Sequence, residues 1–198
     1  MSSARRKASM LAPSWERSPS EAICRSSWTA SSKWKRRYSL SLLLRGVSED
    51  DLDLLAEMNK QLIEDEGSSN PMNRQELKER MREWLRSSWN ADLLVLGDEV
   101  VGYALYCYKR NQHDPNRREV YLRQYFIKRE FRQRGYGLLG IERLRESRFK
   151  GIDTIEIEVL DGNSTGKSFW QKAGFLPYSI LMKLENDSSL INPPDSRK

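Results

Sequence analysis

Arginines and glycines in the middle of the chain form the pattern Arg132-x-x-Gly135-x-Gly137, directly before an apolar helical repeat. Glycines at the start of a helix let backbone N–H groups approach an anion closely, and the helix dipole favours negative charge there. Arginine adds charge-assisted hydrogen bonds that suit phosphate oxygens. The pattern therefore predicts a pyrophosphate cradle that consists of Arg132, Gln133, Arg134, Gly135, Tyr136 and Gly137.

Two kinds of nucleotide site compete for this cradle. Gly135-x-Gly137-x-x-Gly140 matches the dinucleotide fingerprint, and Glu156 lies about twenty residues further on, where a ribose ligand would be expected. That fingerprint needs a strand that leads almost directly into the first glycine. Here seven mostly charged residues, 128–134, separate Gly135 from the apolar segment that ends at Ile127. The remaining chain is also too short for a second mononucleotide-binding half.

Other motifs stand at fixed places around the cradle. A strand-like segment, 154–160, precedes Asn163, and Phe169-Trp170 precedes Ala173-Gly174-Phe175; upstream lies the hairpin-like segment 99–106. With these motifs in this order, the chain resembles the GCN5-related N-acetyltransferases across residues 39–184, and Arg132-x-x-Gly135-x-Gly137 is similar to their acyl-CoA signature. A lone glycine-rich loop is a weak signal, whereas three ordered motifs are specific.

The resemblance implies an α/β fold with the element order βααβββαβαβ. Its central sheet is mixed and mostly antiparallel, with helices on both faces. Two neighbouring parallel strands splay apart, here 121–127 and 154–160, and the pantetheine arm of acetyl-CoA fills the gap. Backbone groups of Tyr125, Phe126 and Ile127 would then bind the pantetheine and thioester, Asn163 the pantetheine amide, and the helix that carries Trp170 would line the coenzyme.

Catalysis cannot be assigned to a residue from the sequence. In many relatives a tyrosine protonates the departing thiolate, but Trp170 stands at that position, and an indole N–H has no useful acidity. Tyr125, Tyr136 and Tyr178 are alternatives, and electrostatic help to the thiolate is another. No metal is expected, because no His or Cys spacing fits one, and His113 in a polar loop is expected to be solvated.

The residues expected to bind the acceptor amine differ from those of the acetyltransferases that this part of the chain resembles. Val101–Tyr106 and Tyr121-Leu122 resemble spermidine/spermine acetyltransferases, which carry an acidic pair after Tyr-Leu. Here the pair is Arg123-Gln124, and an arginine repels a polycation. Glu64 and Glu66, at the end of the first helix, are either acceptor-site acids or a solvated helix end. Arg123 either binds a substrate carboxylate, which would suit an amino acid or peptide N-terminus, or pairs with these acids.

Local signals predict the elements that position these residues. They are a strand at 39–45, a helix between a Ser48 cap and Gly67, and a helix capped by Asn73. A hairpin follows, 91–96 and 100–108, and the last strand is expected at 178–184.

Length and charge predict one folded domain between two tails. Of the net charge of +6, residues 1–40 contribute +7 (nine basic, two acidic) and residues 41–198 contribute −1 (25 basic, 26 acidic). We therefore expect a disordered basic tail at 1–37, an N-acetyltransferase domain at 38–185 and a flexible tail at 186–198. The first tail fits a mitochondrial transit peptide, an over-long start or, less well, a nucleic-acid-binding arm without a recognition module.

The expected function is acetyl-CoA-dependent acetylation of a small-molecule amine. Acetylation of peptides or proteins and a non-catalytic acyl-CoA sensor are the alternatives. Two cysteines and the lack of a secretory signal or membrane-length apolar run favour the cytoplasm, or the mitochondrion if 1–37 is a transit peptide. Neither a membrane nor a specific nucleic acid is an expected partner, and a homodimer is left open.

Overall fold

A five-stranded sheet forms the centre of the computed structural model, which describes residues 42–184. Its strands follow chain order: β1 (Leu42–Gly46), β2 (Trp89–Leu96), β3 (Glu99–Arg110), β4 (Arg118–Ile127) and β5 (Thr154–Glu156). Pairs β1–β2, β2–β3 and β3–β4 are antiparallel, and β4–β5 is parallel. The mixed, mostly antiparallel α/β sheet is thereby confirmed. The tails predicted at 1–37 and 186–198 lie outside the described residues.

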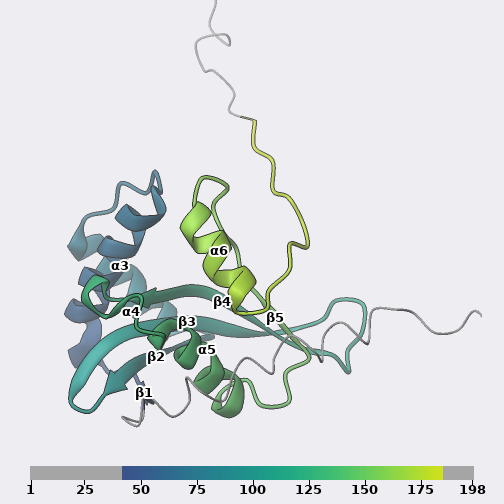
Figure 1. Ribbon diagram of the computed structural model, residues 1–198, viewed down its shortest axis with the longest axis horizontal. Helices are drawn as coiled ribbons and strands as arrows, with labels where there is room; N and C mark the ends of the chain where they lie inside the picture. Colours follow the sequence, from purple (N-terminus) through teal and green to yellow (C-terminus); the bar gives the residue numbers. More distant parts are fainter. Residues whose placement is uncertain (1–41, 185–198) are drawn as a thin grey trace, which may run out of the picture.

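Helices α3 (Leu52–Glu66) and α4 (Arg74–Leu85) cover one face of the sheet (Figure 1). A capping box of Ser48 and Asp51 begins the short 3-10 helix η1 (Glu49–Asp51) that leads into α3, and Gly67, at φ 64°, ends α3. Asn73 caps α4 as expected: its side chain accepts from the Glu76 N–H. The apolar residues of α3 pack on the sheet in one cluster with Leu93, Tyr103, Leu105 and Phe126.

Helix α5 (Tyr136–Ser147) packs on the opposite face, so the prediction of helices on both faces is confirmed. Its buried Ile141 and Leu144 belong to one cluster with Ala104, Tyr106, Val120 and Leu122. A 3-10 turn, η2 (Arg129–Phe131), joins β4 to the cradle, and α6 (Ser164–Lys172) follows β5. The aromatic side chains of α6 join the same cluster, which brings this helix over the end of the sheet that contains β4 and β5 (Figure 1).

A buried ion pair ties the end of α5 to the sheet. Asp92 of β2, 2% exposed, receives hydrogen bonds from Arg148 Nε (2.9 Å to Oδ2) and Nη2 (2.7 Å to Oδ1). The Tyr106 hydroxyl donates a third, of 2.8 Å. A buried carboxylate needs such partners, because its desolvation is otherwise uncompensated.

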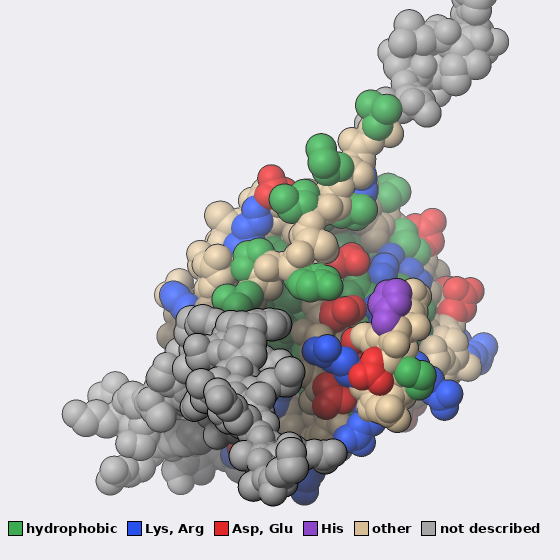
Figure 2. Space-filling model, turned by 90° about the vertical axis from the view of Figure 1, so that its right-hand side faces the viewer, with side chains coloured by type: hydrophobic (Ala, Val, Ile, Leu, Met, Phe, Trp, Pro, Cys, Tyr) green, Lys and Arg blue, Asp and Glu red, His purple; other side chains and the backbone are tan. Residues whose placement is uncertain are grey.

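Two expectations about the last third of the chain were wrong. The strand expected at 154–160 ends at Glu156, and 178–184, expected to be the last strand, forms no strand. Instead the segment after α6 runs away from the sheet, and hydrophobic side chains line its projecting part (Figure 2). Leu176, Tyr178, Ile180, Leu181, Met182 and Leu184 are each at least 79% exposed. Strand preference depends on a partner to pack and pair with, and among residues 42–184 this segment has none.

None of the helices in the described part of the chain is both long and apolar enough to cross a membrane.

Candidate acetyl-transfer site

Strands β4 and β5 separate soon after they meet. Their register pairs Glu119 with Thr154, Val120 with Ile155 and Tyr121 with Glu156, and no later pair follows. Strand β4 continues for six residues to Ile127, paired only with β3. The backbone groups on its other edge are therefore not used by a strand of the described chain. This fork is the splayed pair that the sequence predicted.

The cradle follows directly after the free edge of β4. Gln133 (φ 59°) and Gly135 (φ 86°) both have left-handed backbone conformations, which turn the chain sharply into α5. The first helical hydrogen bond runs from the Leu139 N–H to the Gly135 carbonyl at 3.1 Å, so the preceding N–H groups at the helix start have no intrahelical acceptor. The third glycine has a packing role: a Cβ at Gly140 would lie 2.2 Å from the Tyr125 hydroxyl.

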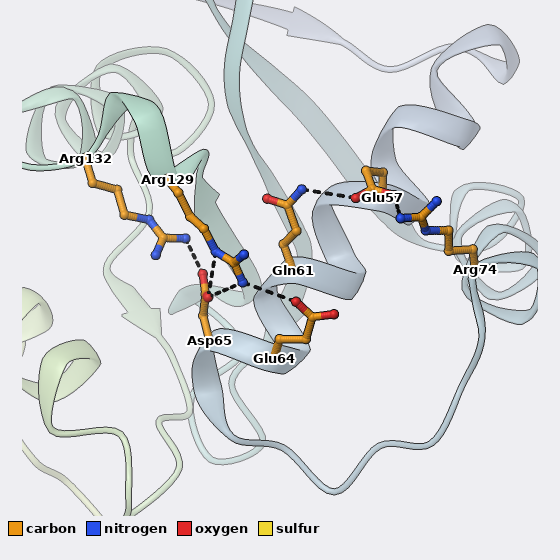
Figure 3. A network of polar contacts seen from close by, with 7 residues as sticks. All are labelled: Glu57, Gln61, Glu64, Asp65, Arg74, Arg129 and Arg132. Carbon is orange, nitrogen blue, oxygen red and sulfur yellow. Dashed lines mark hydrogen bonds and ion pairs between the residues drawn. The ribbon is translucent and has the colours of Figure 1, made fainter.

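The cradle arginine Arg132 is held by an acid of α3. Its Nη2 contacts Asp65 Oδ2 and its Nε donates to the Ile127 carbonyl at 2.8 Å. Arg129 approaches the same helix end and binds Asp65 Oδ1 (2.7 Å) and Glu64 Oε2 (3.2 Å) (Figure 3). The two arginines lower the pKa of Asp65 against the opposing effect of burial. Arg132 would have to leave Asp65 before its Nη2 could bind a phosphate there.

The two acids proposed for the acceptor site, Glu64 and Glu66, differ in their ion pairs. Glu64 faces Arg129, whereas Glu66 is half-buried and makes no ion pair within residues 42–184. Burial, and then the charge of Asp65, raises the pKa of Glu66. Burial mainly raises the pKa of the Tyr103 phenol, and the charge of Glu66 adds to the rise.

Two aromatic side chains of α6, Phe169 and Trp170, pack against Tyr125 of β4 beside the fork and are called the aromatic wall below. The rings of Phe169 and Tyr125 stack at 6.0 Å, and Trp170 lies 5.7 Å from Tyr125. Asn163 caps α6: its Oδ1 accepts from the Gly166 N–H at 2.7 Å. A Cβ on Gly137 would come within 2.9 Å of Phe169, so the cradle and α6 touch. Tyr125, Gly137 and Trp170 thus lie close together beside the fork, and Asn163 caps the helix that carries Trp170. Their assignment to coenzyme contacts stays a prediction.

The tyrosines considered as acids stand in unsuitable surroundings. The Tyr125 hydroxyl donates to the Gly137 carbonyl at 2.7 Å, and burial raises its pKa strongly. Tyr178 is 97% exposed, and Tyr136 is buried in a cluster with Phe131. Tyr121, which the sequence analysis named in the Tyr-Leu motif but did not consider as an acid, stands at the start of the fork. Burial and then the charge of Glu158 raise the pKa of Tyr121 to about 12, with Arg123 also beside it.

A β-bulge places Arg123 and Gln124 on the same face of β4. Leu105 pairs with Gln124 and Tyr106 with Leu122, so Arg123 is an extra residue without a partner on β3. The Arg123 guanidinium lies over Trp84 and Trp89, 5.2 and 5.8 Å from their ring centroids. The alternative that Arg123 pairs with the acids of 64–66 is wrong, because it makes no ion pair with them and Arg129 and Arg132 do.

Gln124 ends a chain of hydrogen bonds that crosses the α3–α4 face. Arg80 Nη2 donates to Asn59 Oδ1 (2.8 Å), Asn59 Nδ2 to the Tyr103 oxygen (3.0 Å), and Tyr103 to Gln124 Oε1 (3.1 Å). Sequence reasoning missed Arg80 and Asn59. Their helical spacing shows which face is buried, but it gives no sign that α3 and α4 share a polar contact.

Two hollows of the surface lie elsewhere. One of about 430 Å³ follows α4 and is lined by Met72, Gln75, Glu76, Glu79, Arg80 and Glu83. The other, of about 330 Å³, is lined by Asp114, Asn116, Arg117 and Asp153. Neither is lined by residues of the fork or cradle. Within residues 42–184, no group of three or more His, Cys, Asp or Glu side chains is placed to hold a metal ion.

Known proteins of the same fold share this architecture. A possible acetyltransferase from Clostridium difficile 630 matches with 17% identity and TM-score 0.63, over 74% of this chain and 97% of its own. The aminoglycoside N-acetyltransferase AAC(6')-Iy, in complex with CoA, matches with 17% identity and TM-score 0.58, over 74% and 95%. An aminoglycoside acetyltransferase from an uncultured soil metagenomic sample, in complex with sisomicin, matches with 13% identity and TM-score 0.54, over 74% and 95%.

At these identities the solved structures show the fold, and the family comes from the sequence. No curated protein matches the chain. The model of the acetyltransferase (GNAT) family matches residues 57–175, which run from α3 through the fork and cradle to the end of the aromatic wall. With that match over more than half its length, the chain belongs to the GNAT acetyltransferases.

Proposed function

We propose that this protein transfers the acetyl group of acetyl-CoA to the amine of a small molecule. The observation that carries the proposal is the free edge of β4 beyond Tyr121, which leads directly to the left-handed turn at Gln133 and Gly135. An extended pantetheine arm suits the unpaired edge of a strand, and a pyrophosphate suits the N-terminus of a helix. The coenzyme would then lie with its phosphates at the cradle and its thioester near the fork.

The reaction requires a neutral amine. The amine nitrogen attacks the thioester carbonyl, the new C–N bond forms as the C–S bond breaks, and one proton passes from nitrogen to base. Glu66 is the residue we propose as that base, since a half-buried carboxyl with a raised pKa holds a proton more readily than a solvated one. Trp170 offers the thiolate at most a hydrogen bond from its indole N–H.

A small-molecule acceptor is favoured over a peptide or protein, and Arg123 makes an acceptor without an acid group, such as spermidine, less suitable. Two neighbours of the same fold act on aminoglycosides, which are small amines. Arg123 stands where an acid would be needed to receive a polycation. The alternative of a non-catalytic acyl-CoA sensor is motivated by Trp170. Peptide acetylation stays an alternative because the fold does not fix the substrate.

Thiol release from acetyl-CoA by the full chain tests the proposal. The acceptor panel would contain amino acids, polyamines, aminoglycosides and short peptides. We expect turnover on one class of small amine, and about tenfold weaker CoA binding by Arg134→Ala, since a charge-assisted hydrogen bond is worth about 1.5 kcal/mol or more. Arg110→Ala, with the same loss of charge at the far end of β3, is the matched control. CoA binding without thiol release from any amine would favour the sensor.

We also propose that the protein is a homodimer joined through the segment 176–184. Six large apolar side chains of this segment are exposed, and an alternating series among them (Leu176, Tyr178, Ile180, Met182, Leu184) suits one face of a strand. Strand β5 is the edge strand of the described sheet and offers such a strand a partner. A second copy would supply the pairing partner that this segment lacks among residues 42–184.

Light scattering after gel filtration would measure the mass of the full chain and of Ile180→Asp/Met182→Asp. We expect a dimer that the double variant converts to a monomer, while Leu43→Asp, another exposed apolar position (57% exposed), leaves it dimeric. A wild-type monomer whose segment is protected from hydrogen exchange would mean that the segment folds back onto its own sheet.

A further inference from the structure

The guanidinium groups of Arg80 and Arg123 lie over the same indole ring, that of Trp84, and form one patch. Arg80 lies 4.7 Å from the Trp84 ring centroid and Arg123 5.2 Å from the same centroid. In the part of the chain that the structure describes, neither makes an ion pair, and Arg80 Nε is buried with no hydrogen-bond partner. Burial, and then the charge of Arg123, lowers the pKa of Arg80. Two positive charges held close together at a partly buried site favour the binding of an anion there.

The hydrogen-bond chain makes the same patch a donor surface. Arginine can only donate, so Asn59 turns its oxygen to Arg80 and its amide nitrogen to Tyr103. The Tyr103 hydroxyl must therefore donate to Gln124 Oε1, which leaves the Gln124 amide nitrogen as the free end of the chain. Gln124 and Arg123 are neighbours at the bulge and reach the same face. A ligand group at this place meets donors, which suits a carboxylate and not an ammonium group.

The position of this patch relates it to acetyl transfer. The bulge follows the last β4–β5 pair, Tyr121 with Glu156, by two residues, so Arg123 stands at the start of the fork. The cradle lies at the other end of the free edge, past Ile127. A coenzyme with its phosphates at the cradle and its arm along β4 would bring its thioester end toward the bulge.

We infer that the acceptor carries a carboxylate or a similar acid group, which Arg123 and Arg80 bind with the amide of Gln124 while the amine reaches the thioester. The inference rests on the proposed function and specifies its substrate: an amino acid, or another small amine with an acid group close to it. Glu64 and Asp65 do not neutralise the patch, because both bind arginines of the β4–α5 connection (Figure 3).

Matched pairs of acceptors test the inference. Free amino acids and their C-terminal carboxamides differ in the acid group, and thiol release gives kcat/KM for each with the full chain. Because amidation also lowers the pKa of the amine, the values are compared per concentration of neutral amine. We expect the acid of the preferred pair to exceed its amide at least tenfold, mainly through KM. Arg123→Gln should abolish this difference, Arg123→Lys should keep part of it, and Arg110→Gln should leave it unchanged. Equal turnover of acid and amide, or a preference that survives Arg123→Gln, would overturn the inference.

A binding measurement separates this inference from the proposed function. Calorimetry would titrate the N-acetyl amino acids and their carboxamides into the CoA-saturated full chain. Carboxylate-selective binding that Arg123→Gln removes supports the acid subsite even if no amine is acetylated, in which case the proposed activity alone fails. Turnover of uncharged amines with no carboxylate selectivity in either measurement leaves the activity standing and rejects the subsite. Arg123 is exposed at a bulge, so its variants should fold; a melting temperature confirms this before either measurement.

Discussion

The Tyr125 hydroxyl donates a 2.7 Å hydrogen bond to the Gly137 carbonyl and so joins the free edge of β4 to the start of α5. Both residues lie beside the fork where we propose that the coenzyme binds, and the Tyr125 ring also stacks on Phe169 of α6. One side chain therefore holds three parts of the site at a fixed separation: the strand edge, the cradle and the aromatic wall.

Removal of this hydroxyl should loosen the cradle. Tyr125→Phe leaves the Gly137 carbonyl without its donor, and we expect a loss of about 1–2 kcal/mol in the free energy of unfolding. CoA affinity should fall as well, because the cradle is less firmly held. Urea denaturation and calorimetry measure the two effects, with Tyr178→Phe, at a 97% exposed position, as control. An unchanged affinity would show that the bond serves stability alone.

Gly140 lets Tyr125 approach α5 closely. A Cβ there would lie 2.2 Å from the Tyr125 hydroxyl and 2.4 Å from Leu94 Cδ2. Gly140→Ala should cost about 1–3 kcal/mol of stability, since a packed core cannot absorb the extra methyl group. Gly46→Ala is the matched control, because no atom lies within 4 Å of its Cβ. Equal unfolding midpoints for the two variants would argue against close packing at Gly140.

The Asp92–Arg148 pair should be essential to stability. Asp92→Ala leaves Arg148 and the Tyr106 hydroxyl without their acceptor, and we expect a loss of about 2–3 kcal/mol. The estimate lies below that for a fully buried pair because the Arg148 side chain is 37% exposed and gains solvation. Thermal unfolding measures the change. Asp98→Ala, in the exposed β2–β3 turn, should unfold like the wild type; a comparable loss there would reject the buried pair as the cause.

The raised pKa of Glu66 makes stability depend on pH. The folded state favours the neutral carboxyl, so folding loses stability as pH rises from the ordinary value of 4.5 through the higher pKa of the folded protein. Glu66→Gln, which is never charged, should therefore be more stable than the wild type at pH 8 and show no such advantage at pH 4. Urea denaturation at both pH values measures this.

The same variant tests the proposed base. Glu66→Gln should lower kcat at neutral pH by about 100-fold, within the usual range for a general base. It should also remove the acidic limb of the pH–rate profile. A profile that keeps its acidic limb would exclude Glu66 as the base and leave it as a source of charge for the amine.

Local chemistry made much of the fold predictable. The caps at Ser48 and Asn73 and the left-handed Gly67 lie where the sequence expected them, because each is set by a few neighbouring residues. The fork was also expected, since the motifs on either side of it are specific. The segment 178–184 was not, because an alternating apolar pattern becomes a strand only when another strand pairs with it.

Contacts between distant parts of the chain were beyond sequence reasoning. Arg132 was expected to be free for phosphate, yet it binds Asp65, 67 residues earlier, and the order of residues contains no trace of that contact. Arg123 and Gln124 would face opposite sides of a regular strand. Only the bulge, a property of how β3 and β4 pair, brings both to the α3–α4 face.

The bulge also places Arg123 outside the packing of the core. Leu122 and Tyr125 lie on the α5 face of β4, and Gln124 and Phe126 lie on the α3–α4 face. A regular strand without Arg123 would place these four side chains on the same faces. Arg123 is thus an insertion that the core does not need. On our inference that Arg123 binds the acceptor, its exchange for an acid, an aromatic or a small residue should change the preferred amine without repacking the sheet, which makes this single position a starting point for redesign.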